Sequence, residues 1–92
     1  MAENVSEKNR FVKIMVQQIL DGVLQPGDRL PTESELAAQY GIAKTNVHLG
    51  LKEVARLGFL KIVPRHASYV TDIWSHITLD SLSAMVQYLS LI

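Results

Sequence analysis

The stretch that decides the fold reads Leu30-Pro-Thr-Glu-Ser-Glu-Leu-Ala-Ala-Gln-Tyr-Gly-Ile-Ala-Lys-Thr-Asn-Val-His-Leu-Gly-Leu51. Thr32 followed three residues later by Glu35 is a capping box, in which each side chain binds the other residue's backbone N–H at the start of a helix. Gly41 stands where a left-handed residue ends that helix at least cost. A second helix is predicted from about Lys44. Two short helices around such a turn indicate a helix-turn-helix, whose second helix commonly enters the DNA major groove.

These residues resemble the winged-helix domain of the GntR transcriptional regulators. The resemblance rests on Pro31-Thr-Glu-Ser-Glu-Leu-Ala37 and Tyr40-Gly-Ile-Ala-Lys-Thr-Asn-Val47, with Gly22-Val-Leu-Gln-Pro-Gly-Asp-Arg-Leu-Pro31 before them and Leu57-Gly-Phe-Leu60 after them. Their order and spacing match the family from about residue 11 to residue 70. The resemblance implies an α+β, mainly helical fold: a winged helix-turn-helix with a three-helix core, a β-hairpin wing and a C-terminal linker helix.

The rest of the chain fits this organisation. Residues 1–8 are polar and are expected to be flexible. Residues 9–71 form the predicted DNA-binding domain: a first helix over 9–24, a recognition helix over 44–57, and strands over 59–63 and 68–71 that form the wing. The segment between the strands, residues 64–67, is the predicted hairpin turn, and residues 29–30 could add a very short strand beside the wing.

Residues 72–92 form a connector and a helix with an apolar stripe. The stripe consists of Leu79, Leu82, Met85, Val86 and Leu89. Such a stripe needs a partner surface. In the FadR-like branch of the GntR regulators, an all-helical effector-binding domain follows a connector of this kind. The resemblance therefore implies that residues 72–92 lead into a C-terminal effector domain missing from this chain. Two alternatives stay open: the helix folds back onto this domain, or it pairs with its copy in a dimer.

The 92 residues carry nine basic and nine acidic side chains, and therefore a net charge of zero. The distribution is uneven. Residues 44–66 hold five basic residues and one acidic residue, a net charge of +4, whereas the segments before and after each carry −2. A charge cluster alone is usually a solvated helix face. Because this one coincides with the predicted recognition helix and wing, we interpret it as a patch for DNA phosphates.

In the family, basic and hydroxyl residues at the start of the recognition helix read the DNA sequence. Carried over by position and extended along the basic patch, the candidate DNA-binding residues are Ser34, Lys44, Thr45, Asn46, His48, Lys52, Arg65 and His66. Lys44 can neutralise a phosphate or contact guanine, and Asn46 can bind adenine through two hydrogen bonds. Thr45 can serve either backbone or base. In isolation, each of these residues would be read as an ordinary exposed polar side chain.

Several positions depart from the family pattern. Ser34 and His48 stand where arginine is usual, and Ala43-Lys44 replaces Ser-Arg. Ala43 cannot cap the recognition helix with its side chain, at a cost of about 1 kcal/mol unless another group substitutes. The wing tip, usually Gly-x-Gly, is Arg65-His66-Ala67, which puts its conformation in question. We therefore expect an operator unlike the common family site.

The sequence holds no recognisable nucleophile or general-base motif, so we expect no enzyme. It has no cysteine, and its histidines 48, 66 and 76 are too far apart for a standard metal motif, so neither metal nor cofactor is expected. No apolar run reaches the length of a membrane span, which fits a cytoplasmic protein.

The expected function is sequence-specific binding of double-stranded DNA at a pseudo-palindromic operator. The full-length regulator would act as a homodimer under a small-molecule effector. The alternative is a degenerate winged helix used for protein–protein contact.

Overall fold

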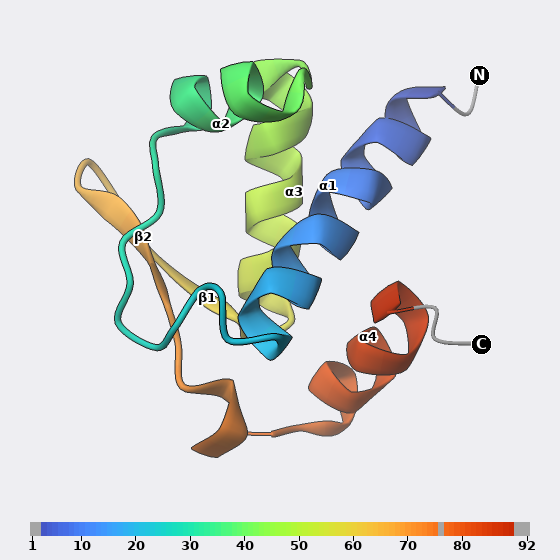
Figure 1. Cartoon of the computed structure of the whole chain (residues 1–92), viewed down its shortest axis with the longest axis vertical. Coiled ribbons are helices and arrows are strands. Elements are labelled where there is room, and N and C mark those ends of the chain that lie inside the picture. Colours follow the sequence, from blue (N-terminus) through green and yellow to red (C-terminus); the bar gives the residue numbers. More distant parts are fainter. Residues whose placement is uncertain (1–2, 76, 90–92) are drawn as a thin grey trace.

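The computed structural model describes residues 3–75 and 77–89, which form four α-helices, one short 3-10 helix and a two-stranded hairpin (Figure 1). The elements in chain order are α1 (Glu3–Leu20), α2 (Glu33–Tyr40), α3 (Lys44–Arg56), β1 (Leu60–Val63), β2 (Ala67–Val70), the short 3-10 helix η1 (Ile73–Ser75) and α4 (Leu79–Leu89). The predicted winged helix-turn-helix is confirmed. His76 lies outside the described residues, as does the side chain of Leu89.

The first helix is longer at its start and shorter at its end than predicted. It begins at Glu3 instead of residue 9, and it ends at Leu20 instead of residue 24. No glycine or proline interrupts residues 3–20, and the side chain of Glu7 has a partner on α3 that ties down this end of the helix. The other end stops early because Gly22 has a φ of 82°, which lies outside the helical region.

The start of α2 and the turn after it follow the sequence closely. The Thr32 Oγ1 accepts a hydrogen bond from the Glu35 N–H at 3.1 Å, and the Glu35 Oε1 accepts one from the Thr32 N–H at 2.9 Å. Gly41 ends the helix with a φ of 64° and donates its N–H to the Ala37 carbonyl. The capping box and the left-handed turn are therefore both confirmed, and together they set how α3 leaves α2.

The wing is an antiparallel pair in which Leu60 faces Val70 and Val63 faces Ala67. The segment before α2 lies beside it, through a bridge between Arg29 and Tyr69, as expected for residues 29–30. The turn has no glycine. Arg65 instead takes the left-handed conformation, with a φ of 63°. Pro64 and Arg65 are the central residues, and the His66 N–H closes the turn on the Val63 carbonyl at 3.1 Å.

The core lies between α1, α2, α3 and the base of the wing. Its buried apolar residues include Phe11, Val12, Met15, Val16, Ile19, Leu30, Leu36, Ile42, Val47, Leu51, Val54, Leu57, Phe59, Leu60, Val70 and Ile73. At the crossing of α1 and α3, the Phe11 ring lies only 2.5 Å from where a Cβ of Gly50 would stand. Only glycine lets the two helices approach this closely, and the contact fixes which side of α3 faces inward.

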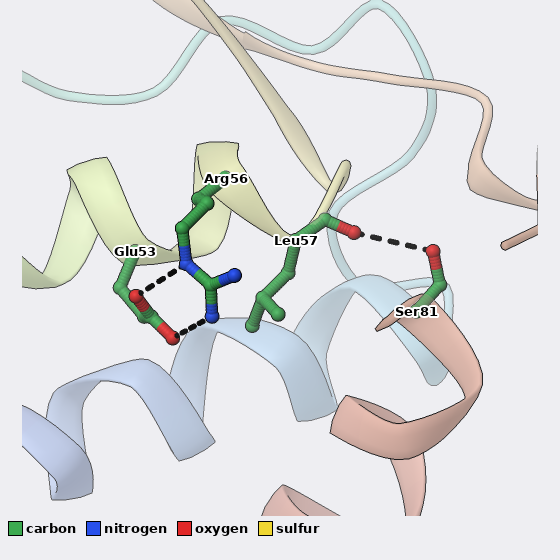
Figure 2. A network of polar contacts seen from close by, with 4 residues as sticks. All are labelled: Glu53, Arg56, Leu57 and Ser81. Carbon is green, nitrogen blue, oxygen red and sulfur yellow. Dashed lines mark hydrogen bonds and ion pairs between the residues drawn. The ribbon is translucent and has the colours of Figure 1, made fainter. Parts of the chain in front are cut away.

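The last helix folds back against the others, which was one of the open alternatives. It lies beside α1 at the end where α3 leads into β1 (Figure 1). Ser81 is fully buried, and its hydroxyl donates to the Leu57 carbonyl at 3.2 Å (Figure 2). Met85 packs against the core, whereas three other stripe residues, Leu79, Leu82 and Val86, stay exposed. The stripe is therefore only partly covered by this domain.

Candidate nucleic-acid interface

The outer face of α3 carries four of the eight residues predicted to contact DNA. Its exposed residues are Lys44, Thr45, His48, Leu49, Lys52 and Arg56. At 3.6 residues per turn these positions fall on one side of the helix, opposite Val47, Gly50 and Val54, which face the core. An outer face of cationic and hydroxyl side chains can meet both phosphates and base edges.

His48 is paired with an acidic residue, Glu33, that is not among the site residues predicted from the sequence. Its Nδ1 lies 2.7 Å from Oε2 of Glu33, the first residue of α2. Because a carboxylate only accepts, Nδ1 carries the proton and Nε2 is left for another partner. Glu33, Lys44, Thr45 and His48 line a shallow depression of about 280 Å³ at the start of α3. Ser34 lies next to Glu33 and is exposed.

Asn46 does not lie where the sequence prediction put it. Its side chain is buried, with 8% of the residue exposed, and its Nδ2 donates to the Glu7 Oε1 at 2.6 Å. It therefore faces α1, and the predicted contact with adenine is not available in this arrangement. Position 46 lies on the inner side of α3, beside the buried Val47, because the packing of α3 against α1 directs this side of the helix inward.

Glu7 also caps the start of the recognition helix, where Ala43 provides no capping side chain. Ala43 makes no side-chain cap, as expected from its methyl group. Its N–H donates instead to the Glu7 Oε1 at 3.3 Å. A carboxylate at this end of α3 also compensates the positive end of the helix dipole. In the sequence, this capping role is indicated only by an acidic residue on the first helix and by the missing side-chain cap at Ala43. The two positions are 36 residues apart, and nothing in their spacing connects them.

The wing forms one side of a larger groove. The groove has a volume of about 310 Å³ and runs between the wing tip and the segment leading into α2. Its lining includes Arg29, Glu33, Arg65 and His66. The ring of His66 lies 5.8 Å from that of Tyr69, centre to centre. Because Glu33 borders both depressions, the wing tip and the start of α3 open onto the same side of the molecule.

Three cations of this side have no ion-pair partner among the side chains that the structure describes. Among the carboxylates whose side chains the structure describes, none forms an ion pair with Lys44, Lys52 or Arg65. Arg56, further along α3, is held by Glu53 through two hydrogen bonds of 3.0 and 2.8 Å (Figure 2). The hydrogen bond from Arg56 lowers the pKa of the Glu53 carboxyl below its usual value, against the opposing effect of burial.

Other kinds of site are not found in the described part of the chain. No group of three or more His, Cys, Asp or Glu side chains there could hold a metal ion. Among the helices that the structure describes, none is long and apolar enough to cross a membrane.

The chain matches known regulators in sequence and in fold. Residues 8–70 match the family described as bacterial regulatory proteins, gntR family. Over 63 residues the chain is 36% identical to an uncharacterized HTH-type transcriptional regulator of Mycobacterium tuberculosis, covering 68% of this chain and 26% of the relative. Over 73 residues it is 33% identical to the fatty acid metabolism regulator protein of Pasteurella multocida, covering 79% of this chain and 30% of the relative. It therefore spans less than a third of the length of either relative.

Among solved structures, BusR of S. agalactiae, in complex with its busAB-promotor DNA, superposes with a TM-score of 0.74. The match covers 94% of this chain and 40% of BusR at 15% sequence identity, so it concerns the fold alone. Family and fold agree with the resemblance noted in the helix-turn-helix residues. The chain belongs to the gntR family of bacterial regulatory proteins, and it is a winged helix-turn-helix domain of a transcription regulator.

Proposed function

We propose that this chain binds double-stranded DNA sequence-specifically, with α3 in the major groove and the wing against the adjacent backbone. The observation that carries the proposal is a set of three cations, Lys44, Lys52 and Arg65, on the side shared by α3 and the wing, which form no ion pair with any carboxylate side chain that the structure describes. A cluster of this kind is the electrostatic footprint of phosphate binding. BusR, which shares this fold, was solved in complex with its promotor DNA, and this supports a DNA-binding use of the fold.

Within this proposal, the contact residues have different tasks. Lys44, Lys52 and Arg65 neutralise phosphates and fix the register on the duplex, whereas Thr45 and His48 reach base edges. Ser34 and His66 complete the contact set at the first turn of α2 and at the wing tip. Asn46 is left out of the contact set, because its amide is buried against Glu7. It orients the recognition helix instead.

The salt dependence of DNA binding tests this assignment. Each phosphate contact contributes about −0.9 to the slope of log affinity against log salt concentration. Replacing Lys44 and Arg65 by alanine together should therefore flatten the slope by about 2. The matched control replaces Arg10 and Lys13 on α1, which removes the same charge from another element. Equal flattening by both pairs, or none by the first, would place the interface elsewhere.

The assembled regulator is proposed to act in the cytoplasm as a homodimer on a pseudo-palindromic operator, with half-sites about 34 Å apart. A small-molecule effector would bind outside these 92 residues and change the spacing of the two domains. The support is the family membership and the short span of this chain relative to its relatives. Sedimentation of the 92-residue chain at micromolar concentration should give a monomer or only a weak dimer, since the main dimer contacts are expected elsewhere. A dimer that survives dilution would contradict this.

A further inference from the structure

One exposed residue of α3 is apolar and has no place among the contacts proposed so far. Leu49 is 46% exposed. A single exposed leucine is ordinary on a protein surface, so exposure alone means little. Its position is informative. Thr45, Leu49, Lys52 and Arg56 are spaced by four, three and four residues, and they form one stripe along the outer face of α3.

The orientation in which α3 packs against α1 keeps Leu49 on this outer face. Its neighbour Gly50 lies against the Phe11 ring, and a Cβ there would come within 2.5 Å of a ring carbon. About one helical turn earlier on α3, Asn46 donates a hydrogen bond to Glu7. These two contacts prevent α3 from turning Leu49 into the core. The apolar side chain is therefore fixed beside Thr45 and Lys52, in the middle of a surface that is otherwise polar.

We infer that Leu49 reads a thymine in the operator by packing against its C5 methyl group. This inference rests on the proposed function. The edges of base pairs in the major groove present hydrogen-bond donors and acceptors, and thymine alone adds an apolar group there. A leucine on a groove-bound helix face thus has one base as its favourable partner, because opposite a polar base edge it would exclude water without replacing the lost hydrogen bonds.

The test compares thymine with deoxyuridine, which lacks only the methyl group. A duplex is first selected with the wild-type chain from a random library, and each thymine is then replaced in turn. At one position per half-site, wild type should lose about fourfold in affinity, which corresponds to burial of one methyl group. Leu49→Ala should bind both duplexes with nearly equal affinity, and Leu49→Met should retain most of the discrimination.

Three controls make the test specific. Lys44→Ala should weaken binding to both duplexes by the same factor and keep the fourfold ratio, because it removes a phosphate contact. Thr45→Ser removes the other methyl group on the stripe and should also keep the ratio. Val23→Ala changes an exposed apolar residue outside α3 and should change neither affinity. Since Leu49 is exposed, its variants should keep the wild-type melting temperature.

The outcomes separate this inference from the function on which it rests. If the library yields no preferred sequence, the proposed function fails and the inference fails with it. If a sequence is selected but no thymine is distinguished from deoxyuridine, only the inference is overturned. The same holds if discrimination survives in Leu49→Ala or disappears in Thr45→Ser. Discrimination that is lost in Leu49→Ala and kept in the controls supports it.

Discussion

Gly50→Ala tests the packing that orients the recognition helix. In an ordinary helix this change would stabilise the protein by about 1 kcal/mol, because alanine has the higher helix propensity. Here the new Cβ would stand 2.5 Å from a ring carbon of Phe11, which is fully buried and cannot move aside without displacing α1. Overpacking of this kind costs about 3 kcal/mol. We expect a net loss of about 2 kcal/mol, or about 10 °C in Tm for a domain of this size.

Urea denaturation of four chains measures the effect: wild type, Gly50→Ala, Phe11→Leu and the double variant. The smaller leucine should accommodate the new methyl group, so the double variant should be more stable than the sum of the single changes by about 1 kcal/mol or more. Gly41→Ala is the matched control. It has a φ of 64° and nothing within 4 Å of the added Cβ, so its cost of about 1 kcal/mol should not depend on Phe11. A Gly50→Ala variant more stable than wild type would refute the close-packing argument.

Three further changes probe the wing, the helix cap and the last helix. Arg65→Gly should raise the free energy of unfolding by up to about 1 kcal/mol in a denaturation experiment, because glycine takes the left-handed turn without strain. The same change should weaken DNA binding in an affinity titration, because it removes a proposed phosphate contact. Glu7→Ala leaves the buried Asn46 amide without this hydrogen-bond partner, so it should lower the free energy of unfolding by about 1–3 kcal/mol. Adding Asn46→Ala to this variant should cause a smaller loss than Asn46→Ala causes in the wild type, because the hydrogen bond is already absent. Ser81→Ala removes the hydrogen bond to the Leu57 carbonyl and should cost about 1 kcal/mol in thermal melts; an unchanged Tm would show that this bond does not hold α4 in place.

The parts of the fold that the sequence predicts are those decided by local chemistry. The capping box of Thr32 and Glu35 and the left-handed Gly41 each depend on neighbours within a few residues, and all three are confirmed. The wing is confirmed although the family glycines are absent, because Pro64 presets one turn residue and Arg65 tolerates the left-handed conformation of the other. The predicted boundaries of the first helix were wrong at both ends: Glu7, in the part expected to be flexible, is helical and bonded to Asn46, and Gly22, with a φ of 82°, ends the helix at Leu20.

The candidate site is harder to predict because its details depend on how elements far apart in sequence meet. Asn46 looked like a base-reading residue from its place at the start of a recognition helix. Its amide turns inward because Glu7, 39 positions earlier, lies beside it. The Glu33–His48 pair and the crossing at Gly50 are likewise contacts between separate helices. No periodicity or motif within one helix carries such information.

An NMR titration of the 15N-labelled chain with the selected duplex shows whether DNA meets the outer face of α3 and the wing tip. The largest amide shift changes are expected on residues 44–52 of α3 and on residues 65–67 of the wing, and the variant with both Lys44→Ala and Arg65→Ala should need a higher duplex concentration to reach them. Changes concentrated on α4 and the outer side of α1, or a spectrum unchanged at saturating duplex, would contradict this expectation.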